Sequence, residues 1–227
     1  MRILRLTTQE LRFTLFFAVI VLIELVSGST NALFDVHFIA KPAIVSSLII
    51  AFYSFSKSAD KTVNKLVLTG LTLSLLGDII LMLVDAWQYA FTLGLVAFLL
   101  AHVCYSAAFW KQRSTEKSPW IIIMVLLAYA LFLFSMLKDN LGAMMVPVVL
   151  YMLVILTMAT LAFLRKKSHH PLGYWLVFTG AILFLISDSL LAINKFLNPL
   201  PLAHIGIMAT YALAQYGIVL GILKSKV

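Results

Sequence analysis

The sequence has few of the residues on which water-soluble domains depend. Charged residues occupy 11% of its 227 positions and hydrophobic residues 63%, whereas a soluble domain carries about 25% charged residues. This composition excludes a soluble globular domain and indicates a polytopic membrane protein. The single cysteine, Cys104, excludes an intrachain disulfide. The net charge of +8 comes from short cationic clusters between apolar runs, so we expect neither a nucleic-acid partner nor an obvious protein partner.

Apolar runs divide the chain into eight segments. Each run is close to the roughly 20 residues that a helix needs to cross a hydrocarbon core about 30 Å thick. Glycine, serine and proline separate the runs, and the connections are too short to hold a soluble domain. We therefore predict one all-α domain over residues 1–227, a bundle of eight transmembrane helices with runs at about 11–26, 38–55, 66–84, 88–110, 119–137, 143–164, 173–193 and 203–223.

The distribution of lysine and arginine predicts the orientation of this bundle. Fourteen of the 17 cations fall on one side if the runs alternate in direction, and Lys41, Lys138 and Lys195 fall on the other. Because cytoplasmic loops carry the excess of cations, we expect both termini in the cytoplasm. The N-terminal segment also resembles a secretory signal peptide, but Glu24 interrupts its apolar stretch, which favours a first span. We expect a multi-pass protein of the bacterial inner membrane.

Two aspartates, Asp78 and Asp188, lie deep inside apolar runs. A charge near the bilayer centre costs about 2.5–3.5 kcal/mol on insertion scales, so such a residue marks a functional site by default. Counted from the predicted external ends of their runs, the two carboxylates lie roughly 9 Å and 7.5 Å deep. They therefore share one level, which favours a joint site. The alternative is that Asp78 has a structural role only, in an ion pair with Lys41.

Further polar residues recur on helical stripes near these aspartates. Serines precede both of them, and the fourth and eighth runs each carry a polar stripe at i, i+4 spacing or close to it. The same residues can instead be interior packing or hydrogen-bonding groups, as His102 and Tyr211 illustrate. The candidates for substrate binding are Lys41, Ser74, His102, Tyr105, Ser187, Tyr211 and Gln215.

The sequence offers little for a metal site. It contains neither HxxxH nor HExxH, and its histidines within the runs are not paired on one helix face. Zinc needs three or four converging ligands. We therefore expect no metal and no cofactor. Glu24 and His204 are interpreted as residues near the membrane interface.

Several of these motifs carry a resemblance. Lys41-Pro42, Ser74 to Leu81 (SLLGDIIL), the spacing of Phe98, His102 and Tyr105, and Ser187 to Ala192 (SDSLLA) resemble, in order and spacing, the YhhN-like family of membrane proteins. That family includes the lysoplasmalogenases. The resemblance implies eight helices and hydrolysis of the vinyl-ether bond of a lysoplasmalogen, a lysophospholipid of the bilayer, to a fatty aldehyde and a glycerophospho-alcohol.

The residues fit this chemistry independently. Protonation of a vinyl ether at its β-carbon leaves an oxocarbenium ion, and glycosidases meet the same cation with two carboxylates. Asp78 and Asp188 are therefore the predicted catalytic pair, and Lys41 either tunes the nearer aspartate or binds the substrate phosphate. Two alternatives stay open: a proton-coupled transporter of small molecules or lipids, and a lipid-binding protein without catalytic activity.

Overall fold

Eight long helices account for most of the chain. The computed structural model describes residues 7–56, 60–166 and 171–225, so Arg2, Arg5, Lys57, Lys167 and Lys226 of the predicted cationic clusters lie outside the described residues. Three short 3-10 turns, η1 (Asn31–Leu33), η2 (Lys138–Asn140) and η3 (Gly142–Met144), connect helices. The helices are α1 (Thr8–Ser27), α2 (Phe34–Phe55), α3 (Lys61–Leu81), α4 (Ala90–Lys111), α5 (Trp120–Leu137), α6 (Met145–Leu164), α7 (Pro171–Phe196) and α8 (Ala203–Lys224).

The predicted all-α membrane bundle is confirmed. Within the described ranges, the seven helices α2 to α8 are long and apolar enough to cross a membrane. Helix α1 has similar length but carries Glu10, Arg12 and Glu24. It packs beside α2 and α8. A Glu10–Lys224 ion pair of 2.6 Å and a Thr14–Tyr216 hydrogen bond of 2.6 Å tie it to α8. The chain is thus an integral membrane protein in which α1 is the eighth helix of the bundle.

Local sequence signals set several helix ends. Thr7 and Glu10 form a capping box at the start of α1. Asp60 caps α3 by accepting hydrogen bonds from the backbone N–H groups of Thr62 and Val63. These N–H groups, that of Thr62 above all, favour the ionised carboxylate and lower the pKa of Asp60 below its usual value. Helix α7 begins at Pro171, which needs no backbone donor at that position.

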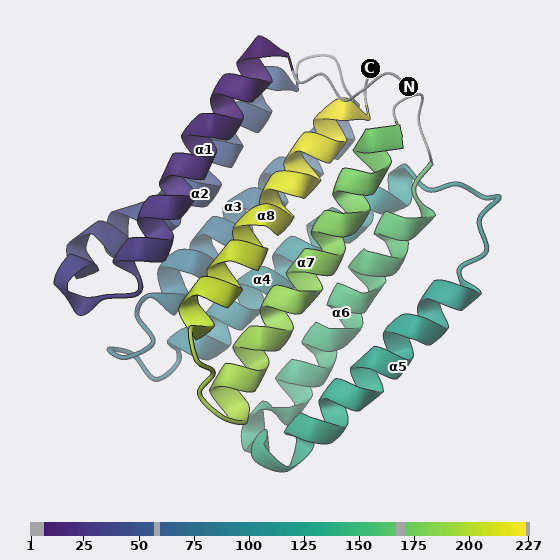
Figure 1. The fold of residues 1–227 in the computed structure, drawn as a ribbon. Coiled ribbons are helices and arrows are strands. Elements are labelled where there is room, and N and C mark those ends of the chain that lie inside the picture. Colours follow the sequence, from purple (N-terminus) through teal and green to yellow (C-terminus); the bar gives the residue numbers. More distant parts are fainter. Residues whose placement is uncertain (1–6, 57–59, 167–170, 226–227) are drawn as a thin grey trace.

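The helices alternate in direction, as the predicted orientation requires. Helices α2, α4 and α6 end at the same end of the bundle where α1 begins and α8 ends (Figure 1). We call the opposite end, where α1 ends and α2 and α8 begin, the distal end. That the distal end faces away from the cytoplasm stays a prediction. In the same view α5 lies at one edge of the bundle and the α1–α2 pair at the other.

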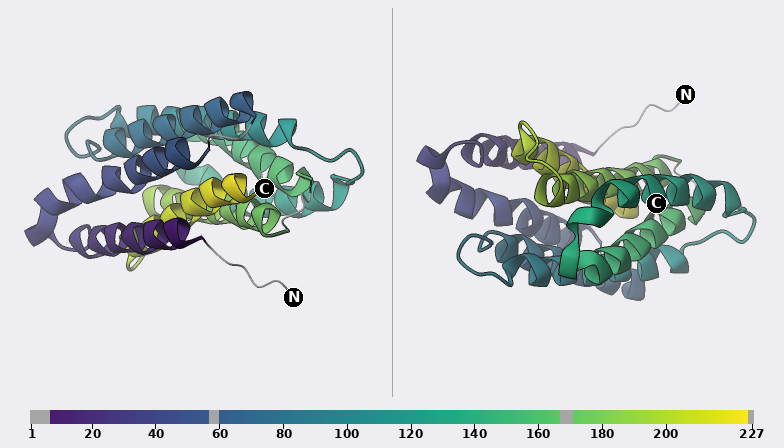
Figure 2. Two further views of the ribbon diagram at one scale, coloured as in Figure 1. Left: turned by 90° about the horizontal axis from the view of Figure 1, so that it is seen from above. Right: turned by 90° about the horizontal axis from the view of Figure 1, so that it is seen from below.

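Two helix pairs form the centre of the bundle. Helices α3 and α4 pack against each other on one side, and α7 and α8 on the opposite side (Figure 2). Glycines allow the closest approaches: a Cβ at Gly217 would lie 2.9 Å from the Leu176 carbonyl oxygen, and one at Gly77 would lie 2.6 Å from the Phe98 ring. Small residues at helix contacts are the usual means of tight packing in membranes. The Gly77 contact also brings the ring of Phe98 against α3, one residue before Asp78 in the sequence.

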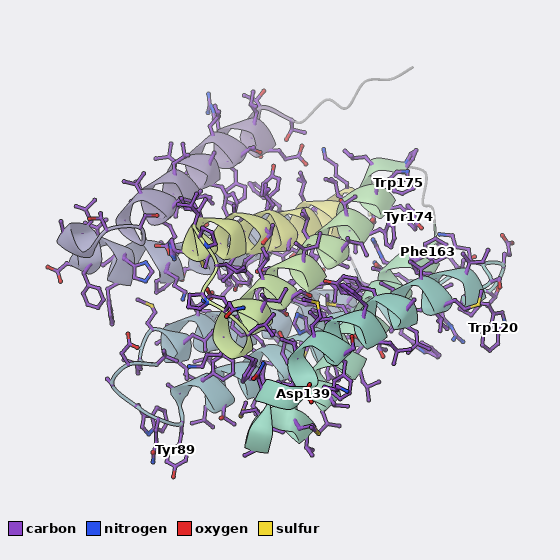
Figure 3. The ribbon with its side chains drawn as sticks, turned by 60° about the horizontal axis from the view of Figure 1, so that its bottom comes forward. Tyr89, Trp120, Asp139, Phe163, Tyr174 and Trp175 are labelled. Carbon is purple, nitrogen blue, oxygen red and sulfur yellow. The ribbon has the colours of Figure 1, made fainter. Side chains whose placement is uncertain are left out.

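Aromatic side chains mark both ends of the bundle. Trp120 and Trp175 lie at one end and Tyr89 at the other, together with Asp139 (Figure 3). Trp120 is 68% exposed and Trp175 50% exposed, as expected for side chains of an interfacial belt.

Candidate active site

Asp78 ends a buried chain of hydrogen bonds that runs through three helices. The Tyr211 hydroxyl of α8 donates to Asp78 Oδ2 over 2.7 Å. Gln215 Nε2 donates to the Tyr211 oxygen over 3.4 Å, and the Tyr105 hydroxyl of α4 donates to Gln215 Oε1 over 2.8 Å. All four side chains are buried, and Asp78 is 2% exposed. A buried carboxylate requires such partners because its desolvation is costly. The structure thus joins four of the predicted site residues.

Asp188 has different partners. The Tyr151 hydroxyl of α6 donates to Asp188 Oδ2 over 2.5 Å, the short length typical of a hydrogen bond to a carboxylate. His102 Nε2 of α4 lies 3.9 Å from the same oxygen. His102 is fully buried, and neither of its ring nitrogens has a hydrogen-bond partner among the described residues. Such an unpaired imidazole is a ready donor or acceptor for a water molecule or a substrate.

An aromatic cluster lies between the two aspartates. It consists of Phe98, His102, Tyr151, Phe184 and Tyr211, whose neighbouring rings are 4.4–6.4 Å apart. Among the described residues, the two carboxylates are joined by no hydrogen bond. Asp78 instead accepts a hydrogen bond from Tyr211 of this cluster, and Asp188 accepts one from Tyr151. The site is therefore two carboxylate–tyrosine pairs around shared rings.

The helix ends differ from the limits of the apolar runs. Asp78 lies three residues before the end of α3, whereas α7 continues for eight residues beyond Asp188. The predicted depths of roughly 9 Å and 7.5 Å, counted from the ends of the apolar runs, therefore do not follow from the helix ends. Whether both carboxylates share one depth in the bilayer stays a prediction.

Asp188 lines an apolar cavity among the described residues, whereas Asp78 is not part of its wall. The cavity lies between α4, α5, α6 and α7, and its wall is almost entirely apolar, with Leu133 and Ile155 as typical members. Its polar groups come from Tyr129, Tyr151, Asp188 and Ser189. The Asp188 side chain is 17% exposed, against 2% for Asp78 as a whole. Asp188 is thus the carboxylate that an apolar molecule in this cavity would meet.

Three of the predicted substrate-binding residues have other surroundings. Lys41 forms no ion pair among the described residues, although its ammonium group is close enough to act electrostatically on Asp78. The Ser74 Oγ is buried beside the Tyr105 hydroxyl but makes no hydrogen bond of good geometry. Ser187 donates to the Ile207 carbonyl over 3.0 Å, which ties α7 to α8. The structure therefore does not bring Ser187 to either aspartate.

Sequence reasoning missed Tyr151. Its hydroxyl is the closest partner of Asp188, but a tyrosine in a long apolar run carries no signal of its own, since its ring suits such a run and only its oxygen needs a partner. The sequence also gave no reason to group Glu24, His37 and His204, which meet at the distal end of the bundle.

Comparisons with known proteins identify relatives of this chain. Human lysoplasmalogenase TMEM86B is 32% identical over 180 residues, which cover 79% of this chain and 73% of that protein. Rat lysoplasmalogenase TMEM86B is 33% identical over 158 residues (68% and 60%), and the lysoplasmalogenase of Mycobacterium tuberculosis is 28% identical over 156 residues (66% and 58%). The matches thus span less than two thirds of the latter two proteins. No solved structure matches significantly. The model of the YhhN family matches residues 36–222, and the chain therefore belongs to the YhhN family.

Proposed function

We propose that this protein is a membrane-embedded hydrolase that cleaves the vinyl-ether bond of lysoplasmalogens or related lysolipids. It would act as a single domain over residues 1–227, in the inner membrane of a bacterial cell. The observation that carries the proposal is the position of Asp188, a carboxylate at the wall of an apolar cavity inside a membrane bundle. The similarity to proteins named lysoplasmalogenase supports the same reaction.

The cavity suits the hydrocarbon part of such a substrate. Its apolar wall offers burial to an alkenyl chain, which gains roughly 0.8 kcal/mol per CH₂ group when it leaves water. The alkenyl chain of the substrate comes from the lipid bilayer and not from water, so most of this transfer free energy is absent. The cavity therefore selects the alkenyl chain by its shape. In this arrangement the vinyl-ether carbons come to Asp188, one of the few polar groups of the cavity wall, and the buried His102 ring lies 3.9 Å from that carboxylate.

The reaction needs one proton donor and one water molecule. The carboxyl group of Asp188 transfers its proton to the β-carbon of the vinyl ether, which forms a C–H bond and leaves an oxocarbenium ion beside the new carboxylate. Water held by His102 then adds to the cationic carbon and gives its proton back to Asp188. The hemiacetal collapses with transfer of its hydroxyl proton to the glycerol oxygen. The products are a fatty aldehyde and a glycerophospho-alcohol, and the proton balance is closed.

Asp78 has a different role in this proposal. It is sealed from the cavity, and Tyr211 and Gln215 hold it in one orientation. From across the aromatic cluster, its negative charge stabilises the oxocarbenium ion, because electrostatic interactions are strong where water is excluded. Lys41 acts either on this charge or on the substrate phosphate. In Lys41→Ala, a fall in kcat would indicate the first role and a rise in KM the second.

The test is release of aldehyde from a lysoplasmalogen by the purified protein. General acid–base groups contribute about 10²–10⁴-fold, so Asp188→Asn should lower kcat by at least about 100-fold, and Asp78→Asn should lower it as well. The matched control is Asp139→Asn, since Asp139 is exposed near the distal end (Figure 3). Normal rates in folded Asp188→Asn protein would refute the mechanism. Proton-coupled uptake into liposomes without aldehyde release would identify a transporter instead.

A further inference from the structure

A second polar cluster lies at the distal end of the bundle, apart from the aspartates. Glu24 comes from the end of α1, His37 from the first turn of α2 and His204 from the first turn of α8. One ligand atom from each residue lies within 4.8 Å of the others. His37 Nδ1 and His204 Nε2 lie 3.0 Å and 3.5 Å from Glu24 Oε1. A carboxylate and two imidazoles, each from a different helix, therefore lie close together.

The burial of Glu24 makes this cluster more than an interfacial hydrogen bond. Its side chain is fully buried, and Oε1 has no hydrogen-bond partner of good geometry among the described residues. His37 Nδ1 bonds the other oxygen, Oε2, over 3.0 Å, and His204 Nε2 also lies 3.4 Å from the Glu24 backbone carbonyl. Lys41 acts on Glu24 electrostatically, but without an ion pair. An ionised carboxylate in this position lacks a close cation, and such burial is costly.

The distances fit a metal ion. Zinc binds imidazole nitrogen at 2.0–2.1 Å and carboxylate oxygen at 2.0–2.2 Å, usually with tetrahedral geometry. Two ligand atoms on such a tetrahedron are about 3.3 Å apart. The two nitrogen–oxygen distances of 3.0 Å and 3.5 Å lie on either side of this value. An ion can therefore bind if these two contacts change by a few tenths of an ångström. The distance between His37 Nδ1 and His204 Nε2 would change somewhat more.

Gly28 makes room for one of the ligands. A Cβ at this position would lie 2.0 Å from His204 Nε2. Any larger residue would push the flexible histidine side chain away from Glu24. The backbone of Gly28 has φ −77°, which every residue adopts, so the glycine is required here by the close approach of the imidazole and not by backbone strain.

We propose that Glu24, His37 and His204 bind one divalent transition-metal ion of the zinc class, which holds the distal ends of α1, α2 and α8 together. Two imidazoles and one carboxylate suit zinc and its neighbours better than magnesium or calcium. Three protein ligands leave a fourth position for water. Glu24 and Gly28 precede the family match at residues 36–222, whereas His37 and His204 lie within it. The ion would thus connect α1, which precedes the family match, to α2 and α8, most of whose residues lie within it.

The experiment measures metal binding by the purified full-length protein in detergent, without an affinity tag that contains histidine. His169 and His170, which lie outside the described residues, are replaced by alanine to remove a competing site. After treatment with a chelator, the protein is titrated with Co²⁺, whose ligand-field absorption reports four-coordinate binding. Zn²⁺ is then quantified after dialysis. We expect one ion per chain, and a rise in the unfolding temperature with Zn²⁺.

Variants test which residues hold the ion. His204→Ala and Glu24→Gln should weaken binding by at least about 100-fold, since even changes behind the ligands cost 10–100-fold. Gly28→Ala should weaken it while it leaves all three ligands in the chain. Asp35→Asn is the matched control, an exposed carboxylate in the same turn as His37, and should bind normally.

Two results would overturn the proposal. The first is wild-type protein that binds no ion at micromolar Zn²⁺, a result that does not depend on whether any variant folds. The second is binding that persists unchanged in His204→Ala and Glu24→Gln. The metal-binding measurement needs no substrate and changes no residue of the aspartate site. A negative result would therefore overturn the metal site without bearing on the proposed hydrolase activity.

Discussion

Replacement of Tyr151 by phenylalanine isolates one hydrogen bond of the candidate active site. The change removes the hydroxyl that donates to Asp188 over 2.5 Å and keeps the ring that packs against His102. A hydrogen bond to a charged group contributes about 1.5–3 kcal/mol, and in the proposed reaction Asp188 becomes charged as it gives up its proton. Each 1.4 kcal/mol corresponds to a factor of ten. If the bond orients Asp188 toward the substrate, kcat/KM for aldehyde release should fall roughly 10- to 100-fold in Tyr151→Phe.

The matched control is Tyr174→Phe on the helix that carries Asp188. Tyr174 is also buried, and its hydroxyl donates to the Phe163 carbonyl over 2.9 Å, beside Trp175 (Figure 3). It lies 14 residues before Asp188 on α7, roughly 21 Å along the helix axis. This variant should lose some stability and keep its kcat/KM per folded molecule. Equal activity of Tyr151→Phe and Tyr174→Phe would refute the reasoning, because the Asp188–Tyr151 bond would then be only a structural contact.

Three further results are expected. Gly217→Val should destabilise the protein by about 1–3 kcal/mol or more, because the new side chain meets the α7 backbone, and thermal unfolding in detergent will measure the loss. The pKa of Asp60 is lower in the folded chain than in the unfolded one, so its capping contribution is present above about pH 4 and is lost as the pH falls below that value. A smaller protection factor of the Thr62 amide in acid, after correction for the intrinsic exchange rate, should reveal this loss. Reporter fusions after Lys111 should read cytoplasmic and one after Lys138 external, and the reverse pattern would contradict the predicted orientation.

The helices and the importance of the two aspartates follow from the sequence alone. An apolar run of about 20 residues has one stable form in lipid, because each backbone N–H and C=O must be paired within its own segment. A carboxylate within such a run is costly enough to stand out. The spacing of Tyr211 and Gln215 also places them on one face, because helical geometry relates residues four positions apart. These inferences use only neighbours along the chain. The structure confirms the helices and the contact between Tyr211 and Gln215, whereas the functional importance of the aspartates stays a prediction.

The partners of the carboxylates depended on the tertiary structure. Tyr151 meets Asp188 across 37 residues of sequence, and His204 meets Glu24 across 180. Ser187, next to Asp188 in the sequence, turns instead to the Ile207 carbonyl of α8. Which face of a helix meets which neighbour depends on its rotation in the bundle, and small residues such as Gly77 and Gly217 allow the close contacts that a given rotation needs. Helical periodicity does not contain this information, because it relates only residues within a turn or two of each other.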